Sequence, residues 1–159
     1  MDDRPADRLV DLLSVVQRLL SRDLGERLAD EGVTVDQWRA LRAIAEQDGV
    51  SMGDLAERLQ MPAPSATRVV DSLVDSAFVF RRPAAEDRRR VDVHLSTRGA
   101  ELLRHTEAIA ELQDEAIRRR IGQQKVELLA QLLKTIVEGT SDARSYSPTG
   151  LSTDRAKTI

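Results

Sequence analysis

Hydrophobic residues recur every three or four positions over most of the chain, which is the periodicity of amphipathic helices. Thr34, followed by Gln37 at the third helical position, forms a capping box at the start of the second helix, and Ser51 is a cap candidate for the third. Ser96 or Thr97 caps the fifth. The predicted helices span about 6–29, 35–47, 52–59, 97–120 and 123–138, with a fourth helix that opens at Pro64 or Ser65 and continues to 74.

The period changes from 3.6 to 2 at Phe78, and alternation resumes over 91–95, so these two stretches predict a β-hairpin. The connecting loop, 82–90, is too long and too charged to be a two-residue turn. We expect it to project into solvent or onto a partner. Residues 139–159 are rich in Ser and Thr and predict a flexible C-terminal tail.

The composition describes one globular domain with an appended segment: 159 residues, 41% hydrophobic and 32% charged. Cysteine is absent, which excludes disulfides, thiolate metal sites and cysteine nucleophiles. No basic segment precedes an apolar run and no window reaches 18 apolar residues, so we expect no signal peptide, no membrane span and a cytoplasmic protein.

Enzymatic chemistry finds no support in the sequence. His94 and His105 lie eleven residues apart without cysteine, a poor zinc site. The chain has no phosphate-cradling glycine motif, and no nucleophile is paired with a base. We therefore expect neither an enzyme nor a cofactor.

The charge is distributed unevenly. The net charge is −3, yet residues 81–90 hold five arginines against two acidic residues, a local +3 that leaves −6 on the rest of the chain. A short cationic patch on an acidic body indicates contact with a polyanion at one place. The alternative is a solvated arginine loop with no partner.

The order of the predicted elements favours a DNA-binding function over a solvated loop. Two short helices joined by a turn and followed by a hairpin form a winged helix-turn-helix, in which the second helix enters the major groove and the wing approaches the backbone or minor groove. The fourth helix presents a polar face with Ser65, Thr67, Arg68 and Ser72. The candidate DNA-binding residues are Arg39, Ser51, Ser65, Thr67, Arg68, Arg81, Arg82, Asp87, Arg88, Arg89 and Arg90.

Three stretches resemble the MarR family of bacterial transcriptional regulators. They are 34–41, 54–56 together with 65–73, and the wing residues 87–89 with 93–99. The resemblance spans about 5–138 and implies a homodimeric regulator of double-stranded DNA, commonly a repressor that a small aromatic or phenolic effector releases. The chain departs from the family at Ala77, where a glycine usually ends the fourth helix.

The resemblance also implies roles for single residues. Asp87 would brace a wing arginine, Arg89 would contact the groove and Arg88 a backbone phosphate. Trp38 is interpreted as a core residue; alternatively it lines an effector cavity, where Arg42 and His105 would contact an anionic ligand. For Arg42 and His105 the alternative is an ordinary surface position.

Dimerisation follows from a separate argument. One recognition helix contacts too few base pairs for specificity, and the first, fifth and sixth helices carry more apolar surface than one lobe covers. We expect an isologous dimer with recognition helices about 34–36 Å apart on a near-palindrome.

The predicted fold is therefore mainly α with a small β-hairpin wing. The DNA-binding lobe spans 34–97, and the dimerisation helices span 5–31 and 98–138. The alternative function is a winged-helix protein-interaction module without sequence-specific DNA binding, which apolar residues on the exposed face of the fourth helix would indicate.

Overall fold

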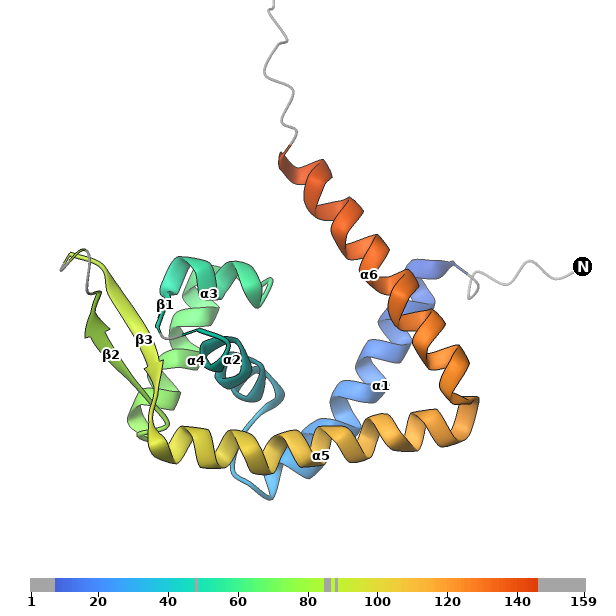
Figure 1. The fold of residues 1–159 in the computed structure, drawn as a ribbon, viewed down its shortest axis with the longest axis horizontal. Coiled ribbons are helices and arrows are strands. Elements are labelled where there is room, and N and C mark those ends of the chain that lie inside the picture. Colours follow the sequence, from blue (N-terminus) through green and yellow to red (C-terminus); the bar gives the residue numbers. More distant parts are fainter. Residues whose placement is uncertain (1–7, 48, 85–86, 88, 146–159) are drawn as a thin grey trace, which may run out of the picture. The chain divides into compact units, whose positions relative to one another are not determined.

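The computed structural model describes residues 8–47, 49–84, 87 and 89–145, with side chains described as far as 139 (Figure 1). Arg88 and residues 146–159 of the predicted tail lie outside the described residues. The helices are α1 (Leu9–Ala29), α2 (Val35–Ala45), α3 (Met52–Arg58), α4 (Ala63–Asp75), α5 (Thr97–Ile121) and α6 (Gln123–Ser145). The strands are β1 (Val50–Ser51), β2 (Val79–Pro83) and β3 (Val91–Leu95).

The predicted caps are confirmed. Thr34 Oγ1 accepts the backbone N–H of Gln37 at 3.2 Å, while the Gln37 side chain accepts the Thr34 N–H at 2.8 Å. Ser51 Oγ accepts the Asp54 N–H at 3.1 Å, and Ser96 rather than Thr97 caps α5 by accepting the Gly99 N–H at 2.9 Å. These bonds satisfy N–H groups that the first turn of a helix leaves without intrahelical partners.

The sheet contains a strand that the sequence analysis missed. Its order is β1-β3-β2, and all pairs are antiparallel. The predicted hairpin is confirmed by the pairing of β2 with β3, in which Val79 faces Leu95 and Pro83 faces Val91. At two residues, β1 is too short to show a periodicity of 2.

One hydrophobic core joins the helix-turn-helix to the sheet. It contains fully buried residues of α2, α3, α4 and every strand, among them Ile44, Leu55, Leu73, Val79 and Val93. Burying such aliphatic side chains is worth about 1.5–3 kcal/mol each, so this core fixes how α4 and the wing lie relative to each other.

The fourth helix begins at Ala63, before the predicted start at Pro64 or Ser65, and an alanine in the left-handed conformation follows its end. Ala77 has φ +58°. Its N–H donates to the carbonyl of Val74 at 2.8 Å, and the Phe78 N–H donates to that of Leu73 at 2.9 Å, the two bonds of a Schellman motif. The turn that glycine usually makes is therefore present with a side chain in its place.

The chain divides into two compact units, 1–113 and 114–159. In the first unit, Leu24, Leu28, Val33 and Trp38 form a second core cluster, against which Leu102 and Leu103 of α5 pack. In the second unit, α6 continues to Ser145, so the prediction that it ends at Gly139 is wrong. Glycine in a helix interior lowers helix stability by only about 1 kcal/mol and need not end it.

None of the described helices is long and apolar enough to cross a membrane.

Candidate nucleic-acid interface

The recognition helix α4 buries one face and exposes a small polar one. Ala66, Val70 and Leu73 are buried, whereas Ser65, Thr67 and Arg68 are exposed. Thr67 Oγ1 donates to the Ala63 carbonyl at 2.9 Å. Short side chains on the exposed face allow the helix backbone to approach the edges of bases.

Ser72 does not belong to this exposed face, contrary to the prediction. It is half-buried, and its hydroxyl accepts a hydrogen bond from Gln37 Nε2 at 2.8 Å. Gln37 thus serves both the capping box of α2 and the contact between α2 and α4. The side chain of Ser72 is committed to holding the recognition helix in place.

The wing is tied to the recognition helix by Arg81. Its Nη2 donates to Oδ1 of Asp71 on α4 at 2.6 Å, between two partly exposed side chains. Along a strand successive side chains point to opposite faces, so Arg81 and Arg82 project to opposite sides of the sheet. Arg81, predicted to contact DNA, is therefore turned toward a carboxylate of its own chain.

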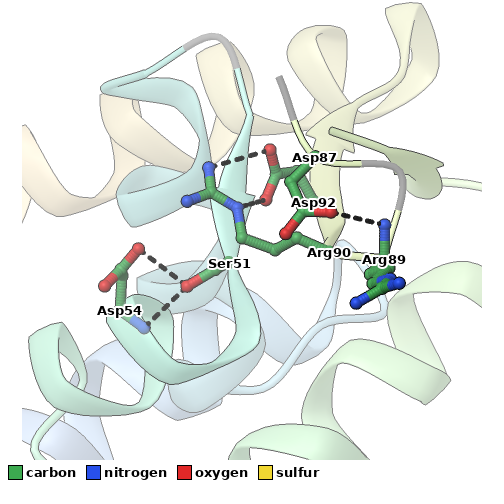
Figure 2. A network of polar contacts seen from close by, with 6 residues as sticks. All are labelled: Ser51, Asp54, Asp87, Arg89, Arg90 and Asp92. Carbon is green, nitrogen blue, oxygen red and sulfur yellow. Dashed lines mark hydrogen bonds and ion pairs between the residues drawn. The ribbon is translucent and has the colours of Figure 1, made fainter. Parts of the chain in front are cut away.

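A second arginine is engaged at the tip of the wing. Arg90 Nε lies 3.1 Å from Oδ1 of Asp92 and its Nη2 lies 3.3 Å from Oδ2, a two-pronged contact with a buried carboxylate. In Figure 2 the Arg90 side chain turns toward Asp92, whose neighbour across the sheet is Ser51 of β1. Bidentate pairs of this kind fix the orientation of the guanidinium.

Among the described residues, Asp87 braces the tip through the backbone of Arg89. Its Oδ1 accepts the backbone N–H of Arg89 at 2.9 Å (Figure 2). This is the local turn that Asp forms with the residue two positions on. The turn positions the Arg89 backbone and leaves its guanidinium without a bond to any residue drawn in Figure 2.

Three arginines of this surface remain available to a partner. Arg68 on α4, Arg82 on β2 and Arg89 at the tip are exposed, and within the described residues none of them forms an ion pair. The predicted cluster therefore separates into arginines that contact a carboxylate of the chain and arginines that have no such contact among the described residues.

Two further predicted contacts lie elsewhere. The Ser51 hydroxyl caps α3 and donates to Oδ2 of Asp54 at 2.7 Å, so the helix already uses it. Arg39 lines an open groove with residues of α2, of α3 and of their C-terminal caps. The structure therefore does not bring Arg39 together with the wing.

Comparison with known proteins agrees with this geometry. A sequence model of the MarR family matches residues 31–90. An uncharacterized HTH-type transcriptional regulator of Mycobacterium bovis is 40% identical over 97 residues, which cover 61% of this chain and 68% of that protein.

The chain belongs to the MarR family.

Other members extend the likeness. The HTH-type transcriptional regulator FarR of Neisseria gonorrhoeae is 32% identical, over 70% of this chain and 76% of its own length. A mutant MarR from E. coli, solved in complex with operator DNA, superposes with a TM-score of 0.74 at 26% identity, over 80% of this chain and 92% of that one. Membership of this family makes the chain a transcriptional regulator rather than an enzyme.

The residues proposed for an effector site are only partly brought together. Trp38 is a buried core residue, and the Arg42 guanidinium lies 5.0 Å from the centre of its ring, a cation–π distance. Arg42 Nε also lies 2.9 Å from Oε1 of Glu107 on α5, an ion pair without a hydrogen bond. His105 is exposed and lines neither of the pockets described below.

The residues that the sequence analysis missed are the acidic partners. Asp92 lies on β3 two residues after Arg90, which directly precedes the strand, and in an extended chain this spacing brings two side chains to the same face, so the opposite charges were a usable signal. Asp71 offered no such signal, because its contact with Arg81 depends on how the hairpin packs against α4.

Proposed function

We propose that this MarR-family chain is a homodimeric repressor that binds near-palindromic duplex DNA, with α4 in the major groove and the wing against the flanking backbone or minor groove. The observation that carries the proposal is the division of the arginines. Arg68, Arg82 and Arg89 have no carboxylate partner in the described part of the chain, while the Arg81–Asp71 pair holds the wing to the helix.

The spacing along α4 supports a joint contact by helix and wing. Arg68 precedes Asp71 by three residues, and residues three apart on a helix are surface neighbours with Cβ atoms about 5–6 Å apart. Arg68 therefore lies within one turn of the point where the wing is attached. A guanidinium there reaches a phosphate or the edge of a guanine.

The repressor acts as a dimer in this proposal, because α1 and α6 expose large apolar side chains. Leu12, Val16 and Leu19 of α1 are about half exposed, as are Leu128 and Leu132 of α6. An isologous partner would cover these helices with their own copies and set the recognition helices about 34–36 Å apart.

The proposed effector site is a pocket of about 530 Å³ that is separate from the groove at Arg39 and is lined by residues of α2, β3 and α5. Its walls are mostly apolar, with Arg104, Glu107 and Glu111 as the charged groups. Because the pocket holds two carboxylates and one guanidinium, it favours a ligand that carries a neutral phenolic hydroxyl over a ligand that carries a carboxylate. Because Glu107 also contacts Arg42 of α2, a ligand here would act on the DNA-binding lobe. A thermal-shift titration with 4-hydroxybenzaldehyde tests the pocket, and Glu107→Gln should weaken the shift.

The alternative, a winged helix that recognises protein, is disfavoured by the face of α4. Ser65, Thr67 and Arg68 occupy its exposed side instead of large apolar residues. Counterion release separates the two functions, because affinity for DNA falls with salt at a slope of about −0.9 per neutralised phosphate.

The test measures affinity for duplexes selected from a random library over a range of salt concentrations. If each of the three arginines in both protomers neutralises one phosphate, the logarithm of the affinity should fall with the logarithm of the salt concentration at a slope of about −5. A flat salt dependence, or failure to enrich any duplex, would refute the proposal.

A further inference from the structure

A basic groove lies between α2 and α3, outside the surface assigned to DNA. Arg39 and Arg42 stand one turn apart on α2, and Arg58 is the last residue of α3. The groove is open and measures about 470 Å³. The remaining lining residues are Ala43, Glu46 and Leu59.

Two of the three guanidinium groups already contact a carboxylate through one nitrogen each. Arg42 is fixed by the Trp38 ring and by Nε at 2.9 Å from Glu107. Arg58 donates through Nη1 to Glu46 at 3.2 Å. A guanidinium carries five N–H donors, and neither arginine has a further polar contact among the described residues. Each therefore keeps donors for a ligand in a preset orientation.

The third arginine has a weaker hold. Arg39 lies 3.8 Å from Asp36, beyond hydrogen-bond distance, and its side chain is 46% exposed. Its donors are therefore available as well. Guanidinium forks match the geometry of carboxylate and phosphate oxygens, so three of them around one hollow select an oxyanion.

The groove lies at the end of α3 that is remote from the sheet. The helix starts directly after β1, and its seven residues span about 10 Å, so Arg58 is carried away from β1 (Figure 1). The wing arginines lie on β2 and on the loop that joins β2 to β3. The groove is thus a separate cationic site, with an apolar floor made by buried Ala43 and half-buried Leu59.

We propose that this groove binds the phosphate or carboxylate group of a small molecule, whose apolar part rests on Ala43 and Leu59. Because α3 is the first helix of the helix-turn-helix pair, occupancy changes the affinity for DNA. That regulatory consequence rests on the proposed function, whereas the binding itself does not.

The test titrates inorganic pyrophosphate into the full chain without DNA, at constant ionic strength, and follows backbone amide signals by NMR and heat by calorimetry. Saturable binding at one site per chain is expected, with shifts confined to the groove. Arg39→Gln and Arg58→Gln should each weaken binding about tenfold, the loss expected for one charge-assisted hydrogen bond.

Arg27→Gln is the matched control, since Arg27 is half exposed and contacts Asp23 at 3.4 Å, much as Arg39 contacts Asp36. Binding by this variant should be unchanged. Arg39→Gln removes no hydrogen bond of the fold, so it tests the site even where Arg58→Gln loosens the contact between α2 and α3.

Absence of saturable pyrophosphate binding would overturn the proposal, as would equal weakening by Arg27→Gln. A selected duplex is titrated in parallel. Groove signals that respond to the duplex and not to pyrophosphate would identify the anion as backbone phosphate, and this too would overturn a small-molecule site. Pyrophosphate binding without any DNA binding would refute the proposed function alone.

Discussion

Arg81 and Asp71 join the wing to the recognition helix, with Nη2 of the arginine 2.6 Å from Oδ1 of the aspartate. Both side chains are partly exposed, so the pair contributes little to overall stability, on the order of 0–1 kcal/mol. Its effect is local, because it fixes an otherwise solvated strand edge against α4. The other wing arginines are presented from this fixed position.

A double-mutant cycle tests this link. Asp71→Asn is isosteric and Arg81→Gln shortens the side chain, and both remove a charge; we expect a coupling free energy of about 0.5–1 kcal/mol in urea unfolding. The coupling should decrease at high salt, since screening weakens exposed pairs. Amide exchange in β2 should accelerate in both single variants. Additive effects on stability and unchanged exchange would show that the pair does not hold the wing.

Removal of an available wing arginine should weaken DNA binding in a measurable way. Arg89→Ala is expected to reduce affinity for a selected duplex more than about tenfold at fixed salt, within the 1–3 kcal/mol that a good groove contact contributes. If Arg82 contacts a phosphate, Arg82→Ala should reduce the salt slope by about one unit per protomer. Arg27→Ala serves as the charge control on α1. Equal losses in all three variants would indicate a general charge effect.

The end of the recognition helix offers a stabilising substitution. Ala77 adopts φ +58°, a conformation that costs a non-glycine residue about 1–2 kcal/mol. Ala77→Gly relieves this strain but increases the freedom of the unfolded chain, so we expect a net gain of about 0.5–1 kcal/mol. Thermal unfolding measures it. A loss of stability would mean that the methyl group of Ala77 makes contacts that outweigh the strain.

Gly99 is required by a close approach at the joint between α5 and β2. A Cβ at this position would lie 2.0 Å from the Phe78 carbonyl oxygen, a distance that no side chain tolerates. Gly99→Ala should therefore destabilise the protein by about 3 kcal/mol, the upper range for overpacking. Gly139→Ala is the control, because a Cβ there meets nothing within 4 Å. It should be neutral or stabilising by up to about 1 kcal/mol, and similar losses in both variants would contradict this account.

Charge on the exposed face of α1 should dissociate the proposed dimer. Leu12 and Leu19 are 48% and 51% exposed. Leu19→Glu removes the burial of one leucine, worth about 1.5–3 kcal/mol, from each of the two protomers of an isologous dimer. The dimer dissociation constant should therefore rise more than about 100-fold. Gln17→Glu adds the same charge at a polar position. Sedimentation velocity measures both, and a wild-type monomer at micromolar concentration would refute the dimer itself.

Local patterns in the sequence predicted much of the fold. The three- and four-residue spacing, the Thr34 and Ser51 caps and the alternation in the hairpin all depend on neighbours within a few residues, and the helices and strands lie close to where these patterns place them. The predicted helix end at Gly139 was wrong because one glycine costs too little to stop a helix that its neighbours favour.

The sequence by itself determined that a winged helix-turn-helix carries a cationic wing, because periodicity and charge are properties of short segments. Only the tertiary structure decided which cations are available. Arg81 and Arg82 are adjacent in sequence, yet one meets Asp71 across the interface between strand and helix, and the other does not. The reason is geometric: the pleat sends consecutive side chains to opposite faces, and only the face of Arg81 packs against Asp71 of α4, while the Asp92 carboxylate across from Arg82 is taken by Arg90.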